Sequence, residues 1–345
     1  MSARAFIAGI AGTVLTDRER AFFRESEPWG LILFKRNINT PDQVRRLTDS
    51  FRDAVGRADA PVLVDQEGGR VQRFGPPHWP SYPSGAGYGR LYDRDPESGL
   101  AAARLGARLI ATDLAAVGID IDCWPVADVP VAGADKSIGD RAFGTDPDKV
   151  AAIAGAVAEG LRDGGVLPVV KHIPGHGRAM TDSHYELPVV DADRTTLAAT
   201  DFQAFRALAG LPLAMTAHVV FTAIDPATPA TTSVTIVREV IRGLIGFDGM
   251  LMTDDISMEA LTGAMRARSR AALAAGCDLV LHCNGRFDEM CEVAEAVPPL
   301  EGVAARRAAA ALAWRRRAPE IDVAEAHNRF AAMMAPVRAD EAARS

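Results

Sequence analysis

Eight short apolar runs, each followed by a segment with helical spacing, constrain the fold of this chain more than any other feature. The runs cover residues 6–10, 30–34, 61–65, 119–124, 167–171, 211–218, 249–254 and 277–283. Runs that are this short and apolar on both faces are typical of parallel strands covered by helices. Because eight such strands can close on themselves, the pattern predicts an α/β fold of the (β/α)8 barrel type.

The segments between the runs carry helix signals. Residues 41–56 follow Thr40, a residue type that caps helix starts, and place Pro41 at the first helical position. Residues 99–118 and 146–165 end at glycine, as helices with a left-handed cap do, and residues 233–246 and 267–276 follow the same plan. The alternative is an open doubly wound sheet, which would carry a Gly-x-Gly-x-x-Gly loop after an early strand; the sequence has none.

Composition and charge limit the domain organisation and the partners. We expect residues 1–345 to form a single catalytic barrel domain, with residues from about 300 folding as outer C-terminal helices. The net charge of −7 argues against nucleic-acid binding, and no run is long enough to cross a bilayer. The apolar stretch near the N-terminus is short and contains glycine, so we interpret it as a strand rather than a secretory signal. A cytoplasmic monomer is expected.

Ionisable residues stand where several predicted strands end. They are Asp65, Asp128, Lys171 with His172, His218, and Asp254 with Asp255. In a (β/α)8 barrel the C-terminal strand ends surround the active site. The sequence therefore predicts a cavity lined by carboxylates, a lysine and imidazoles.

The segment "KHIPGHGRAMTDSHYELP" (171–188) concentrates histidines, and Asp182 stands two residues before His184. In an extended stretch these two side chains would point to the same side. A carboxylate bonded to one ring nitrogen fixes the tautomer and leaves the other nitrogen for proton transfer. A metal site is the alternative, but Pro174 and Gly175 separate His172 from His176 and exclude helical ligand spacing. We expect no metal and no cofactor.

Asp254 and Asp255 are adjacent, so they cannot both face the barrel axis. One should face the cavity and the other should tether the following loop. Spacing alone leaves open which of the two does which.

Several motifs in order make the sequence resemble the family 3 glycoside hydrolases. The motifs are "GLILFKRN", "VDQEGGRVQRF", "IGDRAFGTDP", "KHIPGHG" with "DSH", and "TDDISM". More narrowly, the chain is similar to the single-domain bacterial β-N-acetylglucosaminidases of peptidoglycan recycling, over roughly residues 5–290. Two positions depart from the common pattern: Asp140, where glutamate is frequent, and Ile173, where phenylalanine is common.

The resemblance implies retaining hydrolysis of terminal β-linked N-acetylglucosamine from small muropeptide-derived carbohydrates. Asp254 matches the nucleophile, His184 the acid/base and Asp182 its partner. The sugar-binding positions of the family match Asp65, Arg73, Arg141, Lys171 and His172. A histidine acid/base departs from the usual pair of carboxylates, and we expect the loop 172–192 to close over substrate.

Three other functions remain open from the sequence. They are a phosphorylase of similar architecture, a metal-dependent barrel hydrolase and a non-catalytic sugar sensor. A histidine acid/base would not repel phosphate as a carboxylate would, whereas a sensor has no need of both Asp254 and the Asp182–His184 pair.

Overall fold

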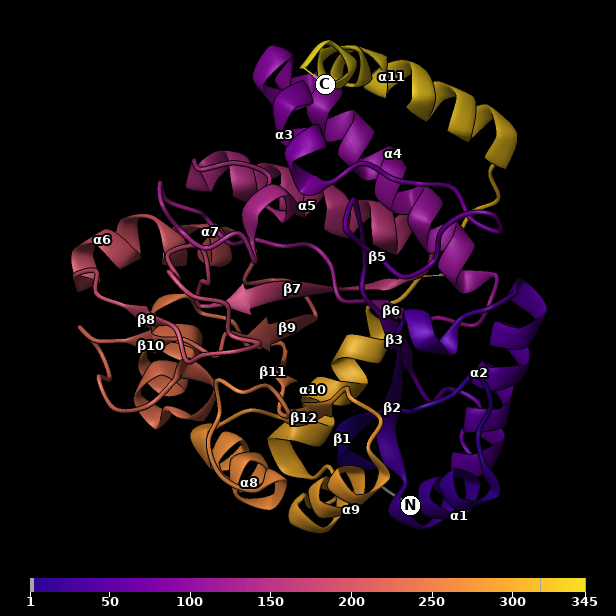
Figure 1. Ribbon diagram of the computed structural model, residues 1–345, viewed down its shortest axis with the longest axis vertical. Helices are drawn as coiled ribbons and strands as arrows, with labels where there is room; N and C mark the ends of the chain where they lie inside the picture. Colours follow the sequence, from indigo (N-terminus) through magenta and orange to yellow (C-terminus); the bar gives the residue numbers. More distant parts are fainter. Residues whose placement is uncertain (1–2, 317, 345) are drawn as a thin grey trace.

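The computed structural model describes residues 3–316 and 318–344, and a closed barrel of parallel strands forms its centre (Figure 1). The barrel strands are β1 (Arg4–Gly9), β2 (Pro28–Leu33), β3 (Val62–Val64), β6 (Ile121–Asp122), β7 (Leu167–Ile173), β9 (Leu213–Thr216), β11 (Met250–Asp255) and β12 (Leu279–His282). They follow one another around the barrel in chain order, and β12 pairs with β1 to close it. The predicted (β/α)8 fold is confirmed, and every barrel strand overlaps one of the predicted runs.

Helices surround the barrel. They are α1 (Asp17–Ser26), α2 (Pro41–Val55), α3 (Gly85–Arg94), α4 (Pro96–Ala115), α5 (Pro147–Asp163), α6 (Arg194–Ala199), α7 (Asp201–Ala207), η4 (Ile236–Leu244), α8 (Met265–Ala275) and α9 (Phe287–Ala296). The helix start predicted at Thr40 is confirmed: its hydroxyl accepts a hydrogen bond from the Gln43 amide at 3.3 Å, at the start of α2. The predicted left-handed cap is present at Gly276 directly after α8. The residues that cap α4 and α5 are not left-handed, and the glycines with positive φ follow one or two residues later, at Gly118 and Gly165. Because helices cover the outside and side chains fill the inside, β2 and β7 are buried along their whole length.

Shorter elements lie in the connections between the barrel strands and the helices. These are η1 (Lys35–Asn37), β4 (Gln66–Gly68), β5 (Val71–Gln72), η2 (Gly139–Arg141), β8 (Val189–Val190), β10 (Val220–Phe221) and η3 (Ala230–Thr232). β4 and β5 form an antiparallel hairpin after β3, while β8 and β10 pair in parallel and join the loops after β7 and β9. The hairpin carries Glu67 and the loop after β7 carries Asp182 and His184, whereas Lys171, His172 and Asp254 lie on the barrel strands themselves.

Helix α10 (Gly302–Ala313) lies at the N-terminal ends of β11 and β12. Its Arg307 binds Asp248 (Nη2–Oδ1, 2.5 Å) and Asp278 (Nη1–Oδ1, 3.1 Å), which directly precede those strands. This end of the barrel is opposite to the one where the strands finish and where a barrel active site is expected.

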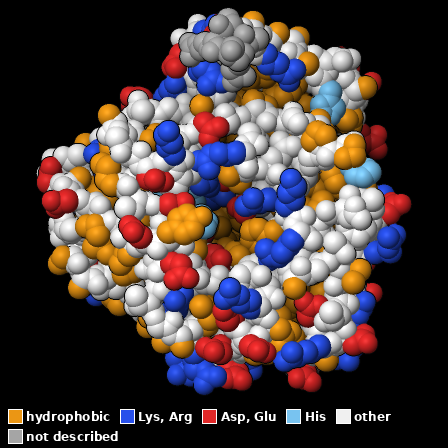
Figure 2. All heavy atoms as spheres, in the orientation of Figure 1, with side chains coloured by type: hydrophobic (Ala, Val, Ile, Leu, Met, Phe, Trp, Pro, Cys, Tyr) orange, Lys and Arg blue, Asp and Glu red, His pale blue; other side chains and the backbone are white. Residues whose placement is uncertain are grey.

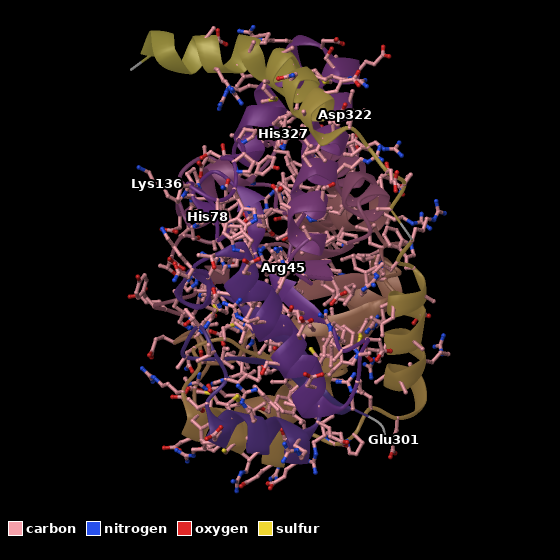
Figure 3. All side chains as sticks on the ribbon, turned by 90° about the vertical axis from the view of Figure 1, so that its right-hand side faces the viewer. Arg45, His78, Lys136, Glu301, Asp322 and His327 are labelled. Atoms are coloured by element: carbon pink, nitrogen blue, oxygen red, sulfur yellow. The ribbon has the colours of Figure 1, made fainter. Side chains whose placement is uncertain are left out.

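Helix α11 (Val323–Arg344) packs on the outside of α3 and α4 (Figure 1). Phe330, Met334 and Val337 are its buried apolar contacts. Figure 3 shows the chain running along the molecule from Glu301, before α10, to Asp322, before α11. Within the described ranges, no helix combines the length and apolar character that a membrane span requires.

Candidate active site

A cavity of about 330 Å³ opens where the barrel strands end. It brings together every residue that the sequence singled out for catalysis or sugar binding: Asp65, Arg73, Arg141, Lys171, His172, Asp182, His184 and Asp254. Apolar side chains from other strands complete its walls, among them Phe34, Met215 and Leu281. In the space-filling view, Lys and Arg side chains gather around a hollow near the middle of the face (Figure 2).

A row of alternating charges, Arg73–Asp65–Lys171–Glu67–Arg141, lies along one wall of the cavity, and we call it the charge chain. All of its members except Glu67 line the cavity. Arg73 Nη2 lies 3.2 Å from Asp65 Oδ2, and Lys171 Nζ lies 2.8 Å from Asp65 Oδ1. Lys171 Nζ also lies 2.7 Å from Glu67 Oε1. Arg141 binds Glu67 through two hydrogen bonds, Nη2–Oε1 at 2.7 Å and Nε–Oε2 at 2.8 Å.

The charge chain stays ionised although it is buried. Burial alone would raise the pKa of Glu67. The positive charges of Arg141 and Lys171 lower it by a larger amount, so that the net pKa is about 2. Burial lowers the pKa of Lys171, yet the neighbouring Asp65 and Glu67 carboxylates leave it raised. The chain holds three cations and two carboxylates, so N–H groups remain for a ligand such as a sugar hydroxyl.

His172 continues the wall beside Lys171 on β7. Its Nδ1 lies 2.7 Å from Asp128 Oδ2, and Asp128 Oδ1 accepts the backbone N–H groups of His172 (3.2 Å) and His176 (2.7 Å). Burial raises the pKa of Asp128, but the contact with His172 outweighs it and the net pKa is lowered. Asp128 is therefore an ionised acceptor that orients the His172 ring through Nδ1.

The Asp182–His184 contact predicted from the sequence is present. His184 Nδ1 lies 2.7 Å from Asp182 Oδ1, and the same oxygen accepts the His184 backbone N–H at 2.9 Å. The predicted extended backbone is wrong: the amides of Tyr185 and Glu186 both donate to the Asp182 carbonyl at 3.0 Å, so the segment is a tight turn. An aspartate that accepts the amide two residues ahead favours such a turn over a strand.

Ser183, between these two residues, anchors the turn to the barrel. Its side chain is 4% exposed, its Oγ lies 3.1 Å from His176 Nε2, and its carbonyl accepts the Ala260 amide at 3.3 Å. Burial, with a smaller contribution from His172, lowers the pKa of His176 to about 4. The His176 ring is thus neutral at ordinary pH, and it contacts the loop through the Ser183 hydroxyl.

The roles of Asp254 and Asp255 separate through their hydrogen bonds. Asp255 Oδ1 accepts the backbone amides of Ser257 (3.0 Å) and Cys283 (3.1 Å), and its carboxylate also binds the Ser257 hydroxyl. Asp254 accepts the amide of Asp255 at 2.7 Å through Oδ1. Asp255 therefore tethers the loop to β12, and Asp254 keeps an oxygen for the cavity.

Asp254 is ionised despite its position at the bottom of a barrel cavity. Burial alone would raise its pKa. His172 and His218, together with the Asp255 amide, lower it by a larger amount, so the net pKa lies below the usual value. His218 lies between Thr231 Oγ1 (2.7 Å) and the Asp255 carbonyl (3.0 Å), so both of its ring nitrogens are engaged. A carboxylate with one unshared oxygen facing a cavity is equipped for nucleophilic attack.

Glu67 is a site residue that the sequence reasoning missed. It stands two residues after Asp65, and this spacing, which places alternate residues of a strand on one side, was the available signal.

Among the described residues, no group of three or more His, Cys, Asp or Glu side chains is arranged to hold a metal ion.

Comparisons with known proteins agree on one family. Residues 15–313 match the model of the glycosyl hydrolase family 3 N-terminal domain. A beta-hexosaminidase of Alkalilimnicola ehrlichii is 43% identical over 280 residues, which are 80% of this chain and 79% of that protein. A beta-hexosaminidase of Bordetella avium is 38% identical over 298 residues, 84% of each chain.

Solved structures give the same result over the length of the chain. NagZ from Neisseria gonorrhoeae, in complex with N-trifluoroacetyl-D-glucosamine, has a TM-score of 0.83 and 32% identity, covering 98% of both chains. The beta-N-acetylhexosaminidase from Beutenbergia cavernae has a TM-score of 0.73 and 29% identity, covering 96% of this chain and 94% of that one.

Proposed function

Because the chain belongs to glycosyl hydrolase family 3, and so is a glycoside hydrolase, we propose that it is a retaining exo-β-N-acetylglucosaminidase. Its substrates would be small muropeptide-derived sugars of the N-acetylglucosaminyl-anhydro-N-acetylmuramic acid type. The observation that carries the proposal is that Asp254 and the Asp182–His184 pair line the same cavity as the charge chain. The relatives named beta-hexosaminidase support the choice of an N-acetylhexosamine.

In the first step, the free oxygen of Asp254 attacks the anomeric carbon and forms a glycosyl ester, while the bond from that carbon to the leaving oxygen breaks. His184 donates a proton from Nε2 to the leaving oxygen. Because Asp182 already accepts from Nδ1, the doubly protonated ring is stabilised before transfer. This use of a carboxylate to orient and stabilise an imidazole has the same logic as in hydrolytic triads.

In the second step, water attacks the anomeric carbon, the ester to Asp254 breaks, and His184 Nε2 accepts the proton of the water. The two displacements at one carbon return the β configuration. Because His184 has already donated its proton to the leaving group, its Nε2 is free to accept the proton of the water.

The charge chain and His172 account for binding of the non-reducing end. If the anomeric carbon lies between Asp254 and His184, the rest of the ring lies against this polar wall. Charged donors that bind hydroxyls in a buried wall discriminate strongly against analogues that lack those hydroxyls. Hydrogen bonds to the terminal hydroxyls would select the non-reducing end of the substrate, as an exo-acting enzyme requires.

The leaving group would extend on the His184 side of the cavity. A depression of about 510 Å³ adjoins the cavity there and shares Arg70, Ser137 and Asp182 with it. Tyr185, which is 77% exposed, lies on its edge. We propose that this depression receives the aglycone, and that the loop 172–192, in which the His184 side chain is 65% exposed, closes over substrate before protonation. We further propose that the whole chain works as one catalytic domain, as a monomer in the cytoplasm.

A product analysis tests the proposal. The purified chain is incubated with 4-nitrophenyl β-N-acetylglucosaminide and with the natural-type disaccharide, and the first-formed anomer is followed by NMR. We expect β-N-acetylglucosamine first, unchanged by a chelator. Formation of the α anomer first, of a sugar phosphate when phosphate is added, or loss of turnover with the chelator would each contradict it.

A further inference from the structure

Glu67 lies between Lys171 and Arg141 in the charge chain but does not line the cavity. The side chains of Glu67 and Lys171 are each 2% exposed, but Lys171 and Arg141 line the cavity and Glu67 does not. We propose that Glu67 is a positioning residue that sets the separation and direction of these two cations, so that their remaining N–H groups meet adjacent hydroxyls of the bound sugar. This inference rests on the proposed function.

The geometry of Glu67 suits this role. One oxygen, Oε1, accepts from both Lys171 Nζ (2.7 Å) and Arg141 Nη2 (2.7 Å), and Oε2 accepts from Arg141 Nε (2.8 Å). A bidentate contact fixes the plane of the guanidinium group as well as its distance. The ammonium group is fixed from two sides, because Asp65 binds it at 2.8 Å.

The backbone around Glu67 is also held. The Gln66 amide donates to Asp122 Oδ1 at 2.9 Å, and Gln66 Oε1 accepts the amides of Arg73 (2.8 Å) and Phe74 (3.0 Å). Gly68 follows at φ +87°, and a Cβ there would lie 2.2 Å from the Pro83 carbonyl oxygen. The carboxylate therefore extends from a rigid hairpin into the space between two cations.

Electrostatics explain why a neutral side chain would not serve. Lys171 and Arg141 repel each other, and the repulsion acts to lower the pKa of Lys171. Without the negative charge of Glu67, the chain would hold three cations against Asp65 alone. A glutamine has the same shape, but its amide nitrogen is a donor and cannot accept from Arg141 Nε. One of the two cations would have to move away from its present position.

The test combines the substitution Glu67→Gln with the removal of single hydroxyls from the substrate. Values of kcat/KM are measured for 4-nitrophenyl β-N-acetylglucosaminide and for its 3-deoxy and 4-deoxy analogues. We expect the wild-type chain to lose about tenfold or more for a missing hydroxyl that a charged group binds. In the Glu67→Gln variant the parent substrate should lose a similar factor, while the penalty for a missing hydroxyl falls to about threefold or less.

Asp278→Asn is the matched control. Asp278 is likewise buried and bound by two cationic side chains, Arg242 at 2.9 Å and Arg307 at 3.1 Å, but it lies before β12, at the opposite end of the barrel. This variant should lose stability and keep the wild-type deoxy penalties. Glu67→Asp keeps the charge and withdraws the carboxylate by one methylene, so it should fold and show reduced penalties like those of Glu67→Gln.

The results separate the two proposals. If the wild-type chain does not hydrolyse the parent substrate, the proposed function fails. If it does, and both Glu67 variants retain the wild-type penalties for the missing hydroxyls, Glu67 supports the fold only and the positioning role is overturned.

Discussion

At the scale of single residues, neighbours rather than residue type decide what each carboxylate does. Asp254 and Asp255 are adjacent on β11, yet Asp255 binds two backbone amides and a hydroxyl, whereas Asp254 accepts a single amide. The hydrogen bonds that tether the loop engage both carboxylate oxygens of Asp255. Asp254 commits one oxygen to a backbone amide and leaves the other to the cavity.

Replacing each aspartate by asparagine should separate these roles. Asp254→Asn should lower kcat by roughly a thousandfold or more, because an amide cannot form the glycosyl ester. Asp255→Asn should mainly lower the thermal midpoint and retain measurable turnover. Steady-state kinetics and thermal unfolding of both variants check this, and equal losses of kcat would contradict it.

His184 should matter in proportion to how poor the leaving group is. In His184→Gln, kcat/KM for substrates with alkoxide leaving groups should fall by about 10²- to 10⁴-fold, because general acid catalysis is lost. With 2,4-dinitrophenyl N-acetylglucosaminide the loss should be under about tenfold, since that oxygen leaves without a proton. The measurement is a plot of log kcat/KM against leaving-group pKa. An unchanged slope in the variant would remove His184 from this role.

At the scale of elements, the loop after β7 shows both the success and the limit of sequence reasoning. The contact between Asp182 and His184 was predicted correctly, but from an extended backbone that the structure replaces with a turn. Spacing encodes that the two side chains are near each other in either conformation. The turn is selected by two hydrogen bonds to the Asp182 carbonyl, and the spacing of Asp182 and His184 does not predict these bonds.

The charge chain shows a second limit. The strand positions and the residues at the strand ends follow from apolar runs and were predicted. Glu67 was missed because it lies on a short hairpin beyond β3. In this hairpin no apolar periodicity shows which side chains point toward the cavity. Its role depends on Lys171 and Arg141, which are distant in sequence and meet it only in the closed barrel.

The anchor of the turn can be tested with Ser183→Ala. Removing the hydroxyl breaks the contact with His176 and should lower kcat/KM for poor leaving groups by about fivefold, the factor that one lost hydrogen bond gives. Good leaving groups should be unaffected. Ser233→Ala is a suitable control, because Ser233 is also a buried serine and donates to Asp225 away from the cavity. Equal effects of both variants on all substrates would contradict a role specific to the turn.

At the scale of the whole molecule, stability and chemistry occupy opposite ends of the barrel. Arg307 of α10 binds acidic residues before β11 and β12, while the charge chain crowds the other end with buried charges. The charge chain makes the fold sensitive to acid. In the folded chain the pKa of Glu67 is about 2, against an ordinary value of 4.5. The pKa of Asp65 is also lowered.

This lowered pKa predicts how stability depends on pH. The Glu67 contribution is complete above pH 4.5 and is lost as pH falls from 4.5 to about 2, because the unfolded chain takes up the proton first. Its size is about 3 kcal/mol as an upper estimate. Denaturant unfolding between pH 3 and 7 should therefore show wild-type and Glu67→Gln chains differing most above pH 5. A difference in unfolding free energy that stays constant over this range would contradict the prediction.

The proposed mechanism depends on direct attack of Asp254 on the sugar. A fluorinated N-acetylglucosaminide that forms the ester quickly and loses it slowly would leave one sugar on the protein, and peptide fragmentation by mass spectrometry would locate it. We expect a single added sugar on Asp254. An active preparation that carries no label, or that carries it on Asp255, would contradict nucleophilic attack by Asp254.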